Sequence, residues 1–599
     1  MTPIDDFSQL DSEAPTGADT ANAAVLTNGR YAVLVTPTGT GYSACGGLAL
    51  TRWIPDAVSD SLGFFLYVND EQTGEVWTST LQPSRSVPRS HSMEVTSGRV
   101  TLRRTDGEVE TVTEICVAVE SDVELRRVTF INHGETPRRL QLTTYAEVVL
   151  NTPEGDAGHP AFSKLFVQTA RTDDDEGLLA KRRPRSPDDQ SLWLEHRLWC
   201  APKCVKGDVE IETDRARFIG RGRSLATPRA MDDRAHLSNT VGNVLDPVLS
   251  IRRRIVVPAR GSASVVMMLA ASETREGVEA IGALYGCPAD EDDPMRVVDA
   301  AFTEAAMRAP EEGDDVASEM LSGAPKAIRS AIERIPRERA ERADVAAIER
   351  VREDLVAFNG YGGFSRDGTE YVIRFERDGD RLRLPPQPWT NVIANERIGF
   401  VASETGAMST WCENSRRNRL TPWYNDPVRD PHGEALYVRD DDSGDFWSPT
   451  PGPVIGAGEY ETRHGMGYSV YRHFGGALEE ETVVFVPRHD PVKIARLRIT
   501  NHGAATRELS VFSYARLVLG ALPWETAPSV VTLASDGVIR ATNPANGEFA
   551  KLVAFATAVS KSDHVHLATD RRAFIGVGRD TEDPAGLGRA GDGGGTGPE

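Results

Sequence analysis

"LTRWIPDAVSDSLGFFLYVNDEQTGEVWTSTLQP" (residues 50–83) and "LTPWYNDPVRDPHGEALYVRDDDSGDFWSPTPGP" (residues 420–453) decide the fold of this chain, because they are two copies of one pattern. At a constant offset of 370 positions, 15 of the 34 residues are identical. The shared residues include the pairs Trp53/Trp423 and Asp56/Asp426. An internal repeat of this size sets the domain organisation, so it is the first feature to explain.

The likeness continues beyond this stretch in the same order. "LRRVTFINH" at 125–133 corresponds to "IARLRITNH" at 494–502, and "TDRARFIGRGR" at 213–223 corresponds to "TDRRAFIGVGR" at 569–579. The chain therefore contains a duplicated domain, and we place its copies at residues 25–272 and 359–584.

Both copies have the sequence texture of β-structure. "LRRVTFINH" and "IARLRITNH" alternate apolar and polar residues, which is the period of a half-buried strand. "NDEQTGEVW" and "RDDDSGDFW" are typical of hairpin turns, with glycine in the turn and tryptophan opening the next strand. The fold class we predict is mainly β: two large antiparallel sandwiches, in which each sheet buries one face.

The two copies differ at their ends. After "FIGRGR", copy one continues into "NTVGNVLDPVLSIRRRIVVPARGSASVVMMLAAS" (239–272), which has the pattern of two closing strands. After "FIGVGR", copy two continues into a glycine-rich stretch. We therefore expect copy two to be incomplete at this end and to leave a sheet edge open. We also expect disorder at 585–599, which is glycine-rich, and at 1–24, which is acidic and has no apolar core.

A short helical segment, 273–358, joins the copies. "ETREGVEAIGALYG", "MRVVDAAFTEAAMRA", "APKAIRSAIERI" and "RADVAAIERVREDLVAFNG" space their apolar residues as helices do. The last of these ends at Asn359 and Gly360, a normal helix stop signal. The segment is too short for a large helical barrel.

Composition excludes several classes of function. The net charge is −22, which is unfavourable for binding nucleic acid phosphates. No window approaches 18 uninterrupted apolar residues, so we expect no membrane span. The six cysteines are sparse and only Cys200 and Cys204 lie close together, so we expect reduced thiols, no metal site and a cytoplasmic location.

The chain resembles the β-supersandwich domains of glycoside hydrolase family 94, formerly glycosyltransferase family 36. Its layout is most similar to the non-membrane region of the cyclic β-1,2-glucan synthases. The stretches that carry the resemblance include "NGRYAVLVTPTGTGYS", "HPAFSKLFVQT", "NTVGNVLDPVLSIRRR", "NGYGGFSRDGTEYVI", "NRLTPWYNDPVRDPHGEALYVRDDDSGDFWSPTPGP" and "RHGMGYSVY".

The resemblance implies a division of labour. In the family, the sandwich precedes an (α/α)6 barrel that carries an aspartate general acid, and inorganic phosphate attacks the anomeric carbon with inversion. We find no counterpart of the barrel in this sequence, so we assign no catalytic residue. We expect no cofactor, and phosphate as a co-substrate only if a barrel is supplied elsewhere.

Sugar-binding residue types are concentrated in "WCENSRRNRLTPWYND" (411–426) and in "RHGMGYSVY" (463–471). Aromatic rings stack on sugar C–H faces, and planar polar groups bond hydroxyls. The candidate substrate-binding residues are Trp411, Asn414, Arg419, Trp423, Asn425, Asp426, His464 and Tyr468.

Each candidate also has a structural interpretation. Trp423 and Trp447 recur at Trp53 and Trp77, which favours a role in the core. Arg419 is replaced by Ala49 in copy one, so the fold does not require it. A histidine on a surface strand, such as His464, is more often structural than a ligand. The arginines of "DRARFIGRGR" suit strand-end turns with salt bridges better than a phosphate site.

We therefore expect a carbohydrate-binding accessory region of a synthase-like protein, which supports glucan synthesis or chain-length control. Its expected partners are a β-glucan and a family 94 barrel or an inner-membrane synthase region. One alternative is an active glycosyltransferase or inverting phosphorylase acting on β-1,2-glucan, and another is a non-functional fragment.

Overall fold

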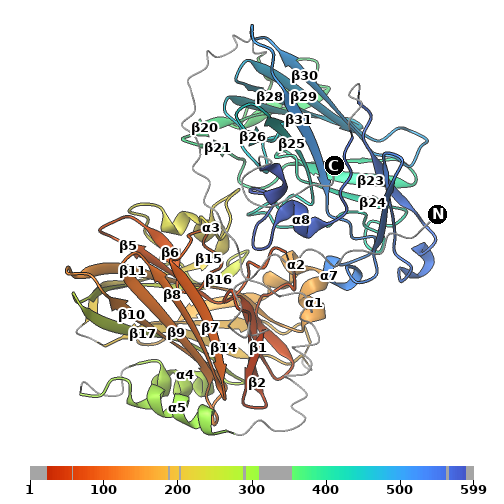
Figure 1. Ribbon diagram of the computed structural model, residues 1–599. Coiled ribbons are helices and arrows are strands. Elements are labelled where there is room, and N and C mark those ends of the chain that lie inside the picture. The colour runs from red at the N-terminus through yellow and green to blue at the C-terminus, as the bar shows by residue number, and fades with distance from the viewer. Residues whose placement is uncertain are drawn as a thin grey trace, which may run out of the picture.

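The computed structural model describes residues 23–56, 58–186, 189–201, 204–287, 292–308, 354–560 and 565–588. They form two β-rich lobes, lobe 1 before the linker and lobe 2 after it (Figure 1). The sheets are antiparallel throughout, which confirms the mainly β fold class. The regions expected to be disordered lie almost entirely outside the described residues. At their margins, however, Ala24 begins a strand and Leu587 is buried.

Lobe 1 is a sandwich of two large sheets. The order of the nine-stranded sheet is β1-β2-β3-β4-β11-β16-β15, with β5 and β6 branching from β11. Its strands are β1 (Ala24–Thr27), β2 (Tyr31–Val35), β3 (Gly41–Cys45), β4 (Leu48–Thr51), β5 (Phe65–Asp70), β6 (Val76–Thr78), β11 (Arg138–Asn151), β15 (Val205–Asp214) and β16 (Pro247–Val257).

The eight-stranded sheet of lobe 1 runs in the order β12-β13-β14-β17-β10-β9-β8-β7. Its strands are β7 (Ser90–Thr96), β8 (Arg99–Asp106), β9 (Val109–Val117), β10 (Val123–Asn132), β12 (Val167–Arg171), β13 (Gly177–Arg182), β14 (Trp193–Cys200) and β17 (Gly261–Ser272). One continuous apolar core fills the space between the two sheets.

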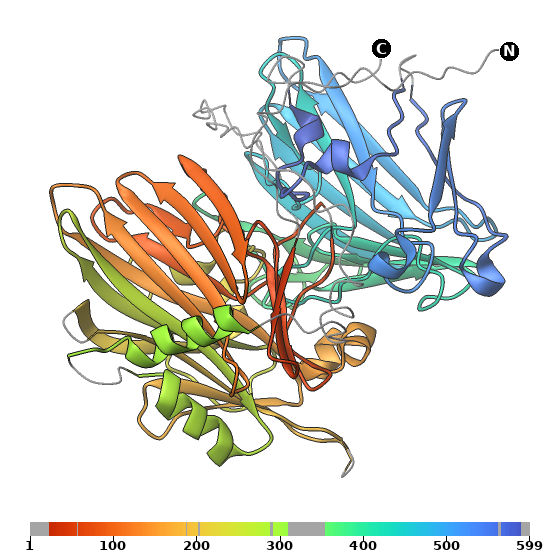
Figure 2. The ribbon, with the colours of Figure 1, turned by 60° about the horizontal axis from the view of Figure 1, so that its bottom comes forward.

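Helices cover the outer face of the eight-stranded sheet (Figure 2). They are α4 (Arg275–Tyr285) and α5 (Arg296–Met307), the first two helices expected in the linker. Val278 and Phe302 pack on strand residues such as Val123, so part of the linker belongs to lobe 1. Short helices α1 (Pro153–Gly158), α2 (Pro160–Lys164) and α3 (Arg215–Ile219) and the 3-10 turn η2 (Arg229–Met231) complete the lobe.

The other two expected linker helices lie mostly within residues 309–353, outside the described part of the chain. The fourth does not extend to Asn359 as its sequence suggested. Val356 instead pairs with Phe364 in a β-bridge, and the Asn359 side chain accepts the backbone N–H groups of Tyr361 and Gly362. An asparagine that bonds its own backbone favours a turn over a helix end.

Lobe 2 is divided into smaller sheets. The largest has the order β18-β19-β27-β28-β29-β30. Its strands are β18 (Gly362–Phe364), β19 (Glu370–Arg374), β27 (Glu459–Gly465), β28 (Tyr468–Gly475), β29 (Leu478–Phe485) and β30 (Ile494–Asn501).

The remaining sheets of lobe 2 contain two or three strands each. They are β20 (Glu376–Asp378) with β21 (Arg381–Arg383); β22 (Thr390–Ala394), β23 (Ile398–Ser403) and β24 (Met408–Cys412); β25 (Glu434–Asp440), β26 (Phe446–Trp447) and β31 (Leu509–Ala515); and β32 (Val531–Ser535), β33 (Val538–Thr542) and β34 (Ala554–Thr557). The helices are α7 (Pro523–Thr526), α8 (Arg571–Ile575), η3 (Gly547–Phe549) and η4 (Ala585–Leu587).

The lobes correspond element by element around the repeat. Tyr67 and Tyr437 each donate a hydrogen bond to a backbone carbonyl, Leu225 O at 2.7 Å and Thr581 O at 2.9 Å. Phe218 packs on Tyr145 at 4.6 Å between ring centroids, and Phe574 on Tyr514 at 5.4 Å. No helix among the described residues is long and apolar enough to cross a membrane.

Candidate functional site between the lobes

The lobes are joined by a reciprocal pair of ion pairs. Arg215 of lobe 1 holds the carboxylate of Asp426 of lobe 2 through two bonds, of 2.8 and 2.7 Å. Arg571 of lobe 2 holds the carboxylate of Asp56 of lobe 1 in the same way, at 2.7 and 3.1 Å. Asp56 and Asp426 occupy matching positions of the repeat, and so do Arg215 and Arg571. Each lobe therefore gives an arginine to the other and receives one in return.

The local sequence explains where these arginines lie. Asp214 caps α3 by accepting the N–H of Ala216, and Asp570 caps α8 by accepting those of Arg572 and Ala573. The "TDR" triplet thus places an aspartate at the cap and an arginine in the first helical position of both helices. The arginine projects from the helix start across the lobe boundary.

Two backbone hydrogen bonds repeat the same exchange. Gly222 N–H donates to Val428 O at 2.8 Å, and Gly578 N–H donates to Val58 O at 2.7 Å. Both glycines have positive φ, +69° and +71°, a conformation that L side chains rarely adopt. The repeated glycine after "FIG" therefore serves the contact between the lobes.

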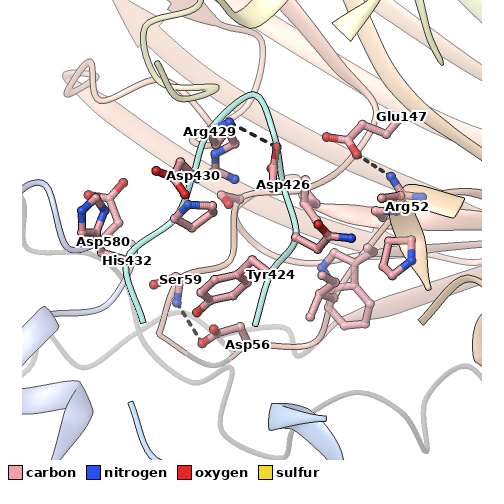
Figure 3. A pocket seen from close by; sticks show the side chains of 18 of the residues that line it. Arg52, Asp56, Ser59, Glu147, Tyr424, Asp426, Arg429, Asp430, His432 and Asp580 are labelled. Atoms are coloured by element: carbon pink, nitrogen blue, oxygen red, sulfur yellow. Dashed lines mark hydrogen bonds and ion pairs between the residues drawn. The ribbon is translucent and has the colours of Figure 1, made fainter. Parts of the chain in front are cut away.

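A cavity of about 580 Å³ lies at this junction (Figure 3). It is lined by both lobes, and its walls combine aromatic rings with charged side chains. The rings belong to Tyr42, Trp53, Tyr424, Tyr514 and Trp524. In volume and composition, the cavity lies within the range of small-ligand sites.

Buried charges on the lobe 1 side form a network around Glu147. Its carboxylate accepts from Arg52 at 2.8 Å and from Arg215 at 2.8 Å (Figure 3 shows the Arg52 pair). Burial alone would raise the pKa of Glu147, but the charges of Arg215, Lys164 and Arg52 outweigh it and hold that pKa below its usual range. Burial would likewise raise the pKa of Asp426, but the charge and hydrogen bonds of Arg215 hold that pKa below its usual range.

A second network lies around Asp56. In addition to Arg571, this carboxylate accepts from Arg516 at 2.9 Å. Burial would raise the pKa of Asp56, but the two arginines hold it below its usual range. Arg516 also lies 3.2 Å from the hydroxyl of Tyr424, which orients that ring at the cavity wall.

A third group combines Glu404, Arg221 and Asp430. Arg221 of lobe 1 donates to Glu404 of lobe 2 at 2.7 Å and lies 3.7 Å from Asp430. Burial raises the pKa of Glu404 to about 7; Arg221 opposes this rise and Asp430 adds to it. This carboxyl group can therefore hold or release a proton near neutral pH.

Two of the candidate sugar-binding residues, Asn425 and Asp426, line the cavity. Asp426 is occupied by Arg215, and its Oδ1 also accepts the N–H groups of Val428 and Arg429. Asn425 has a φ of +47°, which asparagine tolerates better than most residues. Within the described part of the chain, its side chain makes no hydrogen bond.

Arg419 and Trp423 lie next to the cavity on the same stretch of chain. The Arg419 guanidinium lies 5.7 Å from the Trp423 ring centroid and donates to Ala521 O at 2.9 Å. Trp423 is 47% exposed, so its ring is accessible. Its repeat partner Trp53 differs, because it stacks on Tyr42 at 5.8 Å and bonds Asp60.

Trp411 and Asn414 belong to the same edge of lobe 2. Trp411 pairs with Arg419 in a β-bridge, which fixes the start of the stretch. The Asn414 side chain accepts the N–H groups of Arg416 and Arg417 and so closes a turn.

His464 and Tyr468 lie apart from this group, on β27 and β28. His464 Nδ1 is 2.9 Å from Ser469 Oγ and Nε2 is 3.2 Å from Trp389 O. Burial lowers the pKa of His464 to about 4, which the bond to Trp389 only partly offsets. Tyr468 donates to Glu370 at 2.8 Å. The structure therefore does not bring these two residues to the cavity.

The sequence interpretation missed several residues of the site: Arg52, Glu147, Arg221, Glu404, Arg516 and Trp524. One signal was present: the arginine of "TDR" and the aspartate of "W-x-x-D" recur together in both copies. The arginines of "DRARFIGRGR" do form salt bridges at a turn after a strand.

Comparison with known proteins places the chain in a family context. Residues 12–287 and 369–597 match the family model of the glycosyl hydrolase 94 supersandwich domain. The chain is 30% identical to the cyclic beta-(1,2)-glucan synthase NdvB of Rhizobium meliloti (strain 1021), over 92% of this chain and 25% of that protein.

Shorter matches reach two phosphorylases. The chain is 33% identical to the N,N'-diacetylchitobiose phosphorylase of Vibrio furnissii over 26% of this chain and 19% of that protein. It is 29% identical to the solabiose phosphorylase of Paenibacillus borealis over 38% of this chain and 29% of that protein. The matched part of this chain thus spans 19 to 29% of the length of these relatives.

Proposed function

Because this chain belongs to the glycosyl hydrolase 94 supersandwich domain family, its function is related to glycans, and we propose that it binds β-glucan as a non-catalytic accessory region. The proposed setting is a cyclic β-(1,2)-glucan synthase-like protein, in which this region supports glucan synthesis or chain-length control. The name of the relative that matches 92% of the chain motivates this choice of glycan.

One observation carries the proposal: the stretch from Arg419 to Asp426 leads from an exposed aromatic ring into the cavity between the lobes. Trp423 offers an accessible face, and Tyr424 and Asn425 line the cavity immediately after it. Stacking rings next to planar polar groups suit a chain of sugar units. A glucan bound here would contact lobe 1 through Trp53 and lobe 2 through Tyr424.

The charged groups of the cavity suit binding and positioning better than chemistry of their own. Glu147, Asp56 and Asp426 are each engaged by arginine at 2.7–3.1 Å. A general acid must instead present a proton to the leaving oxygen. We therefore propose that any bond-breaking step is performed by a family 94 barrel or by a membrane synthase region acting as partner, with inorganic phosphate as that partner's co-substrate. The proposed location is cytoplasmic, at the inner-membrane synthase.

Calorimetric titration of the full chain with β-1,2-gluco-oligosaccharides tests the proposal. We expect saturable binding that weakens about tenfold in Trp423→Ala and in Arg419→Ala, because each removes one side of the exposed platform. Lys181→Ala is the matched control, since Lys181 lies 4.8 Å from the Trp193 ring centroid and neither residue lines the cavity. Unchanged affinity in both variants would remove the proposed site.

The alternative of an active phosphorylase gives a different result. Incubation of the chain with β-1,2-glucan and phosphate would then release glucose 1-phosphate. We expect no release from the chain alone.

A further inference from the structure

A basic and aromatic surface of lobe 1 lies outside the cavity and has no part in the proposed glycan binding. The hairpin of β13 and β14 carries the run "KRRPR" (181–185). The guanidinium groups of Arg182, Arg183 and Arg185 lie over the ring of Phe166, at 5.2, 5.5 and 5.7 Å from its centroid. A ring has two faces, so at least two of these cations share one face.

The three guanidinium groups are not balanced by carboxylates. In the described part of the chain, none of them forms an ion pair with an aspartate or a glutamate. Arg182 donates to Ser163 instead, to its backbone oxygen at 2.8 Å and to its hydroxyl at 3.1 Å. The carboxylate of Asp189, in the same hairpin, accepts the backbone N–H groups of Arg185 and Ser186. The hairpin is therefore a local concentration of positive charge in a chain whose net charge is −22.

Exposed apolar side chains lie next to these arginines. Phe162 is 51% exposed and Leu165 is 48% exposed. They are three residues apart in and just after α2, so they lie on the same face of this helical turn. The Phe162 ring packs on Phe166 at 5.2 Å between centroids, and Arg185 lies 5.8 Å from the Phe162 centroid. Lys164 of the same helix lines the cavity instead, so the outer side of α2 is the one that presents apolar groups beside cations.

The corresponding place in lobe 2 shows that the fold does not require this combination. Phe162 of "AFSKL" corresponds to Phe549 of "EFAKL" in the repeat. One arginine, Arg417, lies 5.9 Å from the Phe549 ring centroid, and it is paired with Glu548 at 2.7 Å. Phe549 is also less exposed than Phe162. Copy one thus carries three arginines without carboxylate partners where copy two carries one arginine with a partner.

We propose that this surface, made up of Phe162, Leu165, Arg182, Arg183 and Arg185, docks the chain on a membrane that contains anionic lipids. Lipid phosphate groups accept hydrogen bonds from guanidinium groups, and the two apolar side chains enter the layer beneath the head groups. Exposed apolar groups favour a lipid surface over a free anion, which offers them no apolar contact. The net charge of −22 does not prevent docking, because charges more than about 10 Å away are largely screened at about 0.1 M salt.

Sedimentation of the full chain with lipid vesicles tests the proposal. We expect binding to vesicles of mixed phosphatidylglycerol and phosphatidylcholine, and at least about tenfold weaker binding to phosphatidylcholine alone. Reversal of two charges, in the double variant Arg183→Glu and Arg185→Glu, should weaken binding at least about tenfold. Phe162→Ser should weaken it about threefold, because one inserted ring is lost. Arg417→Glu is the matched control, since it reverses the charge of the corresponding arginine in lobe 2 and should leave vesicle binding unchanged.

Both reversed arginines are exposed, so the thermal unfolding of the double variant should match that of the wild-type chain. Several outcomes would overturn the proposal: no binding to either kind of vesicle, equal binding to both, or equal weakening by Arg417→Glu and the double variant. Release from vesicles by inorganic phosphate, beyond that by chloride at equal ionic strength, would instead make the surface a site for the free anion. Binding to soluble polyglutamate that is as tight as binding to vesicles, and that Phe162→Ser does not weaken, would assign the surface to an acidic protein.

Discussion

Arg215 and Asp426 come from different copies of a duplicated domain and form a two-point ion pair, of 2.8 and 2.7 Å, across the boundary between them. Arg571 and Asp56 form the mirror arrangement. The duplication therefore produced an internal, nearly two-fold interface, in which the arginine of each copy bonds the aspartate of the other copy.

Removal of Arg215 should be the most damaging single change at this interface. Its side chain is 2% exposed and also bonds Glu147 and Asp246. Arg215→Ala would leave three buried carboxylates without this partner, at an expected loss of about 3–5 kcal/mol in the free energy of unfolding. Chemical denaturation measures it.

Arg571→Ala is the internal comparison for that variant. The Arg571 side chain is 26% exposed, and the Asp56 carboxylate that it leaves behind keeps Arg516 at 2.9 Å. We expect the smaller loss of the two. Equal losses in the two variants would show that burial does not control the strength of this interface.

The interface should weaken in acid. The pKa values of Asp56, Glu147 and Asp426 are held below their usual range in the folded chain. Stability that depends on a lowered pKa is present above the ordinary carboxyl value, about 4, and is lost as the pH falls below it. Thermal unfolding measured from about pH 7 to about pH 3 should show this loss. Asp426→Asn should make the unfolding temperature depend less on pH.

The contribution of Glu404 to stability should depend on pH in the opposite direction. Its pKa is raised to about 7 in the folded chain, so its contribution is largest below the ordinary carboxyl pKa and is lost as the pH rises through about 7. Relative to Glu404→Gln, the wild-type chain should lose about 1–3 kcal/mol between acidic and mildly basic pH. Arg221, Asp430 and His432 face this region and remain in both proteins. A pH-independent difference would contradict the assignment.

Alanine variants of the two repeat-related tryptophans, Trp53 and Trp423, should distinguish a structural role from a binding role. Trp53 is half-buried, stacked on Tyr42 and bonded to Asp60, so Trp53→Ala should cost about 2 kcal/mol of stability. Trp423 is 47% exposed, so Trp423→Ala should change stability by less than about 0.5 kcal/mol. If Trp423→Ala destabilises as much as Trp53→Ala, the exposed ring is a structural element.

His464 allows a similar separation. Both ring nitrogens have partners within lobe 2, and burial lowers its pKa to about 4. A lowered histidine pKa makes stability fall as the pH drops from about 6.5 towards 4. His464→Gln should reduce that fall. A loss of glucan affinity without a change in the pH profile of unfolding would instead make His464 a sugar ligand.

The repeat and the strand-like sequence pattern in both of its copies made the fold class predictable. Apolar and polar residues alternate in "LRRVTFINH" and "IARLRITNH" because one face of each strand is directed toward the core, and this pattern can be read from the sequence alone.

The site was less predictable, because its contacts join residues 211 and 515 positions apart. Sequence shows that Asp56 and Asp426 are repeated, but not that each faces the arginine of the other copy. Glu404 gave no signal, and Arg221 was expected only as a salt-bridged arginine of a strand-end turn, because the pairing of these two residues arises from burial at the boundary. Residue type alone grouped His464 and Tyr468 with the sugar-binding stretch, but the structure places them on different strands.

A hydrogen-exchange footprint of the full chain with β-1,2-gluco-oligosaccharide tests whether glucan binds between the lobes. We expect slower exchange in 419–432 and in the facing segment 52–62, and little change in α4 and α5. Protection restricted to the β27–β28 region around His464, or no protection at saturating glucan, would contradict it.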